Sequence, residues 1–248
     1  IKKLNSIARF QRLILKRISK TSEIMSNSAK IKIKEIFTSI QGEGPYIGEK
    51  HLFVRTTRCN LNCCYCDTDF LCDENSKEYN YDEFFEELKS YDANVVSFTG
   101  GEPLLEADFL SEFLKRYKNR LNKKIYLETN GTNPEALEKV IDYVDIISTD
   151  IKLKSATGQD FSLITFEDFM DVAKKKEVFA KIIFDENIKE EEIQEAAAFA
   201  KRYGILLVLQ PKMPISENFC PYEIFEKFYA KYKNVRLIAQ MHKFLNIR

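Results

Sequence analysis

Short β-rich runs alternate with amphipathic helical segments from Ile31 onward, and this alternation constrains the fold more than any other feature of the chain. Strands that alternate with helices form a parallel sheet with right-handed crossovers. About six such units are too few to close an eight-fold barrel, so we predict an α/β fold, a partial and open (β/α) barrel. The predicted strands are 31–37, 51–56, 95–98, 125–128, 145–149, 178–184, 205–209 and 235–239. The predicted helices are 81–90, 105–120, 134–143, 165–176, 189–203 and 221–233.

The composition excludes several other classes of protein. Lysine and arginine number 38 and aspartate and glutamate also 38, whereas a general nucleic-acid binder is usually strongly basic. Hydrophobic residues make up 44% of the chain, which is enough for a buried core. No run approaches the ~20 apolar residues that span a bilayer. The 248 residues suit one main domain, which we place at 25–248.

Residues 1–24 differ from the rest of the chain, because they hold seven basic residues against one acidic residue. Their apolar residues have a rough helical spacing, and a basic amphipathic helix can bind a membrane or serve as a transit peptide. We favour the alternative that this basic extension is an artefact of where the sequence starts. Met25 lies just before the first predicted strand, and the apolar core and cleavage site of a signal peptide are missing.

The cysteines are concentrated in one loop. Five of the six lie between Cys59 and Cys72, and the sixth is Cys220. Disulfide frameworks spread their cysteines along short secreted chains, so this clustering argues for a metal or iron–sulfur site instead. Such a thiol loop needs a reducing compartment, and we therefore predict a cytoplasmic protein.

Cys59, Cys63 and Cys66 form the pattern C-x3-C-x2-C directly after a predicted strand. Soft thiolate ligands select iron–sulfur clusters or zinc over hard cations. Three thiolates can hold three corners of a [4Fe–4S] cluster, which leaves one iron open to a substrate or cofactor. A closed zinc site needs four ligands, so structural zinc remains an alternative if Cys64 or Cys72 supplies the fourth.

With Tyr65 as the aromatic residue, the spacing C-x3-C-x-aromatic-C resembles the cluster motif of the radical S-adenosylmethionine (SAM) superfamily. The resemblance implies that Cys59, Cys63 and Cys66 bind a [4Fe–4S] cluster and that SAM coordinates the open iron. One external electron then cleaves SAM to a 5′-deoxyadenosyl radical. Tyr65, Cys66 and Asp67 would lie against the bound SAM.

Further polar motifs follow the later strands, and parallel strands of such a sheet end on the same side. In the superfamily the turn Gly100-Gly101-Glu102 binds the amino group of SAM, with Glu102 adding negative charge. The resemblance implies that the other motifs line the SAM ribose, carboxylate and adenine, with Lys152 near the carboxylate. Each motif is also compatible with an ordinary strand-to-loop exit. The residues predicted here are Thr129, Asp150, Lys152 and Gln210.

A second set of motifs closely resembles the 7-carboxy-7-deazaguanine synthase family of the queuosine-precursor (7-deazapurine) pathway. Ser-Ile-Gln-Gly-Glu-Gly at 39–44, Phe-Val-Arg at 53–55, Cys-Asn-Leu at 59–61 and Tyr-Cys-Asp-Thr at 65–68 occur in family order. The resemblance runs from about Ile31 to the C-terminus. It implies a lyase that contracts 6-carboxy-5,6,7,8-tetrahydropterin to 7-carboxy-7-deazaguanine with loss of ammonia.

The resemblance also implies how the pterin would bind. Gln41 and Glu43 offer acceptors to its aminopyrimidinone ring, and Arg55 can grip its carboxylate in bidentate fashion. His242 would bond the substrate or transfer a proton. The hydroxyl of Thr68 is the expected Mg²⁺ contact. Each side chain also has an alternative without function: Gln41 and Glu43 fit a polar turn, Arg55 a surface ion pair and His242 a structural histidine. The predicted substrate contacts are Ile40, Gln41, Gly42, Glu43, Arg55, Thr99, His242 and, through its terminal carboxylate, Arg248.

Two departures and two alternatives qualify the resemblance. Arg58 stands where the family usually has glycine, and 148–152 reads Ser-Thr-Asp-Ile-Lys where many members have Ser-Pro-Lys. Which of these residues contacts SAM therefore stays open. One alternative is a glycyl-radical-enzyme activase, which would use the same cluster. The other is a zinc-stapled binding module, which would catalyse no reaction. The expected partners are a flavodoxin- or ferredoxin-like electron donor and a second copy of the chain in a homodimer, with neither nucleic acid nor membrane.

Overall fold

The computed structural model describes residues 29–63, 66, 76–158 and 163–247. The basic extension 1–24 and the predicted site residues Tyr65, Asp67, Thr68 and Arg248 lie outside the described residues. The helices that follow are α2 (Tyr81–Ser90), α3 (Ala107–Leu121), α4 (Pro134–Val140), α5 (Lys154–Thr157), α6 (Leu163–Ala173), α7 (Glu190–Tyr203), α8 (Pro221–Lys231) and α9 (Met241–Leu245). Single 3₁₀ turns are η1 (Gly44–Tyr46), η2 (Pro103–Glu106) and η3 (Ile141–Tyr143).

The described strands form one nine-stranded sheet in the order β3-β1-β2-β4-β5-β6-β7-β8-β9. Strands β2 and β4 to β9 run parallel, as predicted. The sheet is open, because β3 and β9 stand at its two edges, and the partial barrel is confirmed. The strand bounds are β1 (Ile31–Ile40), β2 (Lys50–Thr56), β3 (Lys77–Tyr79), β4 (Val95–Gly100), β5 (Lys124–Thr129), β6 (Ile146–Asp150), β7 (Glu177–Phe184), β8 (Leu206–Pro211) and β9 (Val235–Leu237).

Strand β1 departs from the predicted parallel arrangement, since it pairs antiparallel with both β2 and β3. The chain between β1 and β2 is too short for the crossover that a parallel pair requires. An antiparallel hairpin is therefore the pairing open to these neighbours. This hairpin places its connecting loop, residues 41–49, beside the ends of the parallel strands.

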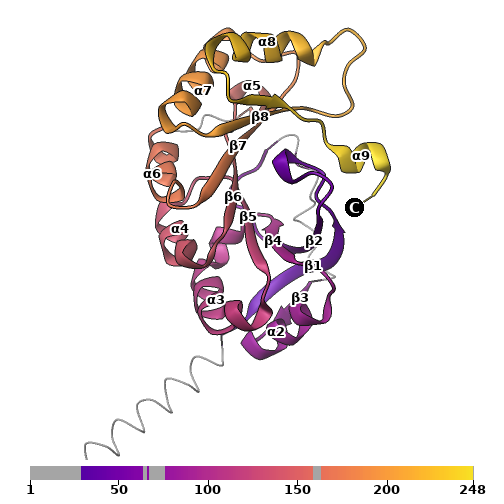
Figure 1. Ribbon diagram of the computed structural model, residues 1–248, viewed down its shortest axis with the longest axis vertical. Coiled ribbons are helices and arrows are strands. Elements are labelled where there is room, and N and C mark those ends of the chain that lie inside the picture. Colours follow the sequence, from indigo (N-terminus) through magenta and orange to yellow (C-terminus); the bar gives the residue numbers. More distant parts are fainter. Residues whose placement is uncertain (1–28, 64–65, 67–75, 159–162, 248) are drawn as a thin grey trace, which may run out of the picture.

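Helices cover one face of the sheet, with α3, α4, α6 and α7 along its outer side and α9 on the opposite side (Figure 1). The helix starts follow from local chemistry. At α2 the Asn80 side chain accepts from the Glu83 N–H, and the Glu83 carboxylate accepts from the Asn80 N–H, at 3.0 Å each. This capping box satisfies backbone donors that have no partner within the first turn. Phe84 and Leu88 of the same helix are fully buried.

The two faces of the sheet differ because successive side chains of a strand point to opposite sides. Residues facing the helices are apolar and belong to the main core: Leu52, Val54, Val96, Phe98, Ile125, Leu127, Ile147, Ala180, Ile182, Leu207 and Leu209. Residues at the start of the inner face form a second, smaller apolar cluster: Val95, Tyr126, Ile146, Phe179 and Val208. Two to four residues farther along each strand, the side chains on the same face are polar. The inner face is therefore an apolar floor with a polar layer above it.

No helix among the described residues is both long and apolar enough to cross a membrane.

Candidate functional site

A cavity of about 260 Å³ lies above the polar layer, at the carboxyl ends of the parallel strands. Its walls come from the β1–β2 loop, from the strand ends and from the segment around α9. Most of the predicted site residues that the structure describes line this one cavity. They are Ile40, Gln41, Gly42, Glu43, Arg55, Cys63, Cys66, Thr99, Gly100, Gly101, Thr129, Asp150 and His242. Cys59, Glu102, Lys152 and Gln210 lie outside its lining.

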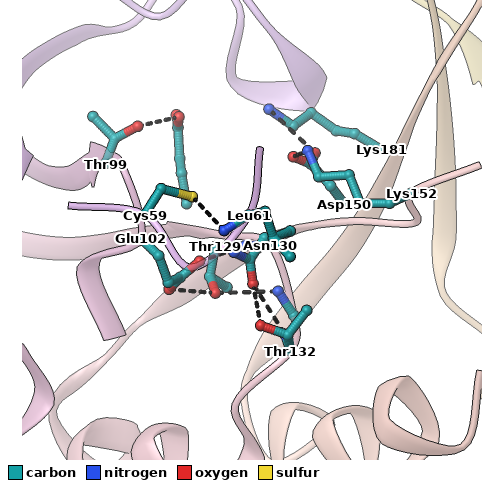
Figure 2. Close-up of polar contacts among 12 residues, drawn as sticks. Cys59, Leu61, Thr99, Glu102, Thr129, Asn130, Thr132, Asp150, Lys152 and Lys181 are labelled. Atoms are coloured by element: carbon teal, nitrogen blue, oxygen red, sulfur yellow. Dashed lines mark hydrogen bonds and ion pairs between the residues drawn. The ribbon is translucent and has the colours of Figure 1, made fainter. Parts of the chain in front are cut away.

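The three motif cysteines lie on one side of the cavity, directly after β2. Cys63 and Cys66 line it, and the Cys66 N–H donates to the Cys63 carbonyl oxygen at 3.1 Å. The Cys59 sulfur accepts from the Leu61 N–H at 3.4 Å (Figure 2). Burial raises the pKa of both Cys59 and Cys63, so their thiols are protonated without a metal. No three His, Cys, Asp or Glu side chains within the described part of the chain already form a metal-binding group. Metal binding releases the protons of such thiols.

The donor set fits an iron–sulfur cluster, because three soft sulfur ligands come from one loop beside a cavity open to a further ligand. The loop is held by direct backbone contact with the end of β4. The Glu102 N–H donates to the Arg58 carbonyl oxygen at 2.7 Å. A Cβ on Gly101 would come within 1.9 Å of the same oxygen, so only glycine permits this approach.

Glu102 supports the site from below and does not line the cavity, and its predicted contact with SAM stays a prediction. Its buried carboxylate accepts from the Leu104 N–H at 2.9 Å, the Thr129 hydroxyl at 2.8 Å and the Asn130 N–H at 2.7 Å. Burial raises the pKa of Glu102 to about 7, and these hydrogen bonds oppose part of that rise. The carboxylate thus joins the Gly-Gly turn after β4 to the end of β5 (Figure 2).

We expect Glu102→Gln to lower the free energy of unfolding by about 1–3 kcal/mol, the cost of leaving a buried polar group unsatisfied. Whichever way the amide is oriented, its NH₂ group faces a backbone N–H, of Leu104 or of Asn130. Chemical denaturation measures the change. Glu112→Gln serves as the control, since Glu112 is a partly exposed carboxylate on α3 that pairs with Arg116, and its stability should stay within about 0.5 kcal/mol of the wild type. Equal stability of the two variants would contradict the supporting role.

Gln41 and Thr99 are oriented by Glu128, the residue just before the predicted SAM contact Thr129. The Glu128 carboxylate accepts from the Gln41 amide at 2.8 Å and from the Thr99 hydroxyl at 2.8 Å. The Gln41 oxygen accepts from the Glu43 N–H at 3.0 Å. These bonds fix which end of the Gln41 amide is the donor. Each end keeps one further hydrogen-bonding capacity, so Gln41 can offer a donor as well as the predicted acceptor.

Glu43 lies in a buried ion pair with Lys181 of β7, at 2.6 Å between its Oε2 and the Lys181 Nζ. Its second oxygen accepts from the Gln240 amide at 2.8 Å. Burial alone would raise the pKa of Glu43, but Lys181 and Gln240 outweigh it and lower the pKa to about 2. Glu43 is therefore an anion at the cavity wall.

Lys152 and Gln210 stand beside the cavity and not in its lining. The Lys152 ammonium pairs with Asp150 Oδ2 at 2.7 Å, so it holds a wall residue (Figure 2). Gln210 is fully buried, and both polar atoms of its amide lack a hydrogen-bond partner among the described residues. A buried amide without partners is costly, which favours a polar ligand at this strand end.

Arg55 and His242 close the cavity from the other side. The Arg55 guanidinium pairs with Glu35 Oε1 at 3.1 Å and lies 5.3 Å from the centre of the Phe37 ring. It is fixed in position and still faces the cavity. The His242 ring packs on Gly42, where a Cβ would come within 2.4 Å of Nδ1. The Met241 N–H donates to the Gly42 carbonyl oxygen at 2.9 Å, so the start of α9 is joined to the β1–β2 loop.

Three polar residues of this wall have no predicted role of their own: Glu128, Lys181 and Gln240. Strand parity carries a signal for two of them. Glu128 stands two residues after Tyr126, and Lys181 two residues after Phe179, on the inner face of β5 and β7. Gln240 follows β9 and shows no comparable pattern.

Comparisons with known proteins identify relatives of this chain. Residues 53–209 match the family model of the Radical SAM superfamily. The chain is 32% identical to the 7-carboxy-7-deazaguanine synthase of Archaeoglobus fulgidus, over 86% of this chain and 97% of that protein. It is 34% identical to the enzyme of the same name from Methanocaldococcus jannaschii, over 87% and 99%. Among solved structures, QueE from Escherichia coli has the same fold, with a TM-score of 0.60 and 18% identity over 88% of this chain and 96% of that one.

Proposed function

Since the chain belongs to the 7-carboxy-7-deazaguanine synthase family of the Radical SAM superfamily, we propose that it makes 7-carboxy-7-deazaguanine by ring contraction of 6-carboxy-5,6,7,8-tetrahydropterin. Ammonia is the second product. The observation that carries the proposal is that the cysteine loop and the residues Gln41, Glu43 and Arg55 line one shared cavity. A glycyl-radical-enzyme activase has no need of this pterin-binding set, and family membership sets aside the zinc-stapled module.

The cofactors are a [4Fe–4S] cluster, SAM and Mg²⁺. When bound, the cluster and SAM supply the one-electron chemistry that starts the reaction. Cys59, Cys63 and Cys66 would hold the cluster. The Gly100-Gly101 turn lets the backbone approach SAM closely, and the orphan amide of Gln210 offers it both a donor and an acceptor. Thr68, the proposed Mg²⁺ contact, lies outside the described residues.

The opposite charges along the cavity wall would orient the pterin. Glu43 is an anion that accepts hydrogen bonds from the donor-rich aminopyrimidinone ring. Arg55 lies where it can grip the substrate carboxylate in bidentate fashion. His242, above Gly42, is positioned to bond the substrate or to move a proton. The contribution of the chain is to fix the substrate in a cavity that limits access of water.

Anaerobic turnover tests the proposal. The reconstituted protein is given SAM, Mg²⁺, a one-electron reductant and the pterin, and product is followed by its deazaguanine absorbance and its mass. We expect 7-carboxy-7-deazaguanine to form together with ammonia. Cleavage of SAM without any conversion of the pterin would instead favour the activase. The flavodoxin- or ferredoxin-like donor, the homodimer and the cytoplasmic location stay predictions.

Arg55→Ala should raise the KM or the dissociation constant for the pterin by about 10–150-fold, because charge-assisted hydrogen bonds contribute about 1.5–3 kcal/mol. SAM binding should stay unchanged. Calorimetry with the reconstituted, unreduced protein separates the two ligands. Arg116→Ala is a matched control, since Arg116 also pairs with a carboxylate, Glu112, and lies over a ring, that of Tyr81, away from the cavity. Equal pterin affinity in the two variants would rule out the assigned role.

A further inference from the structure

Lys181 is a buried cation in the wall of the candidate site, and no predicted role accounts for it. It lies on the inner face of β7, above Phe179 of the apolar floor, and its side chain is 8% exposed. Its ammonium donates to Glu43 Oε2 at 2.6 Å. The same ammonium stands 3.8 Å from Asp150 Oδ1 (Figure 2). A lysine ammonium is rarely buried this fully unless it is paired with an opposite charge.

The Glu43 carboxylate is held at both of its oxygens. Lys181 donates to Oε2 and the Gln240 amide donates to Oε1, while the Glu43 backbone N–H is bound by Gln41. Each carboxylate oxygen has two lone-pair sites, so each can accept one more hydrogen bond. The fixed carboxylate can therefore receive two parallel N–H donors from one edge of a flat ring.

We propose that Lys181 is a positioning residue that acts through Glu43: its ammonium fixes this carboxylate as an anion, and the anion selects the donor-rich aminopyrimidinone edge of the pterin. The inference rests on the proposed function and goes beyond it, since it names the residue on which substrate selection depends. Lys181 touches Glu43, and the substrate contact belongs to Glu43.

The charged groups around Glu43 and Lys181 support the proposal that Lys181 keeps Glu43 ionised. Glu43 faces Lys181 on β7 and His242 on α9, and both lower its pKa. Lys181 faces Glu43, Asp150, Glu128 and the hydroxyl of Tyr126. Burial lowers the pKa of Lys181, but the surrounding carboxylates outweigh burial and hold it well above the usual value. Lys181 thus keeps its charge at any pH where the protein works.

Removing the ammonium leaves a buried carboxyl with its desolvation penalty and without its main counter-charge. The pKa of Glu43 should then rise from about 2 past its ordinary value of 4.5 toward that of Glu102, an equally buried carboxyl whose pKa is about 7. Below that new pKa the carboxyl is protonated and accepts hydrogen bonds poorly. Pterin affinity of Lys181→Met should therefore be low at acidic pH and recover as the pH rises, whereas the Glu43 contribution in the wild type is constant from pH 6 to 8.

Calorimetric titration of the reconstituted, unreduced holoprotein with the pterin tests this at pH 6, 7 and 8, in the presence of SAM. The ratio of variant to wild-type dissociation constants at each pH cancels the titration of the ligand. For Lys181→Met we expect a ratio of at least about tenfold at pH 6 that shrinks toward pH 8, since one pKa unit corresponds to tenfold. Lys181→Arg should remain within about threefold. Lys118→Met, which removes a lysine paired with Asp145 outside the cavity, is the control and should bind like the wild type.

A double-mutant cycle with Glu43→Gln guards against misfolding and isolates the route of the effect. In Glu43→Gln/Lys181→Met both members of the pair are neutral, so neither leaves the other as an unpaired charge. This double variant should bind the pterin within about threefold of Glu43→Gln alone. Full additivity of the two losses would overturn the inference, as would a pH-independent ratio near one for Lys181→Met. In those cases the wild type still binds and converts the pterin. If the wild type itself neither binds nor converts it, the proposed function fails first.

Discussion

Cys59→Ala is expected to prevent the anaerobically reconstituted protein from retaining its [4Fe–4S] cluster and to abolish formation of 7-carboxy-7-deazaguanine. Removal of one thiol leaves two ligands where the motif provides three, and two thiolates cannot hold three corners of a cubane cluster. The fold should persist, because among the described residues the Cys59 thiol makes one weak hydrogen bond, with the Leu61 N–H. Iron and sulfide per chain, the visible absorbance of the cluster and product formation are the measurements.

Cys220→Ala is the matched control for this experiment. Cys220 is an exposed free thiol immediately before α8, outside the cavity lining, so its loss should change neither iron content nor turnover. A Cys59→Ala protein that still binds iron and makes product would refute the cluster assignment. Wild-type protein whose cluster is held by four protein ligands would refute the open coordination position on which SAM binding depends.

The sequence predicted most of the fold because its signals are local and repeated. The alternation of apolar residues gave the parallel strands and the larger helices to within a few residues, and α2 begins and ends as predicted. Short elements escaped. β3 has three residues and α9 five, which is fewer than two full repeats of the strand or helical pattern. The antiparallel direction of β1 depends on the length of a loop, not on any pattern within the strand.

The sequence predicted the parts of the site that depend on backbone motifs. It did not predict the parts that depend on the direction of individual side chains. The Gly100-Gly101-Glu102 turn was predicted as part of the site, and Gly100 and Gly101 line the cavity. The turn did not reveal that Glu102 lies outside the cavity lining, because its carboxylate is held by Thr129 and Asn130 at the end of another strand. Lys181 reads in the sequence as a single charge within an apolar strand. Only the pairing of β6 with β7 brings it level with Asp150.

Gly101→Ala is expected to lower both cluster occupancy and stability, although the change adds one methyl group. The new Cβ would lie 1.9 Å from the carbonyl oxygen and 2.4 Å from the carbonyl carbon of Arg58, and 3.1 Å from the Cys59 nitrogen. These are backbone atoms, so the cysteine loop itself must move. We expect a loss of at least about 2 kcal/mol in the free energy of unfolding, toward the upper part of the range for overpacking. Iron content and chemical denaturation measure the two effects.

Gly204→Ala separates this clash from the general effect of replacing a glycine. Gly204 ends α7 with a φ of 68°, and a Cβ there would meet no atom within 4 Å. It should cost about 1–2 kcal/mol through left-handed backbone strain and leave iron content unchanged. If Gly101→Ala retained full iron and turnover, the close approach of the β4 turn to the Arg58 carbonyl would not be needed to hold the cluster. If it lost iron while Gly204→Ala did not, the backbone contact between β4 and the cysteine loop is what holds the first cluster ligand in place.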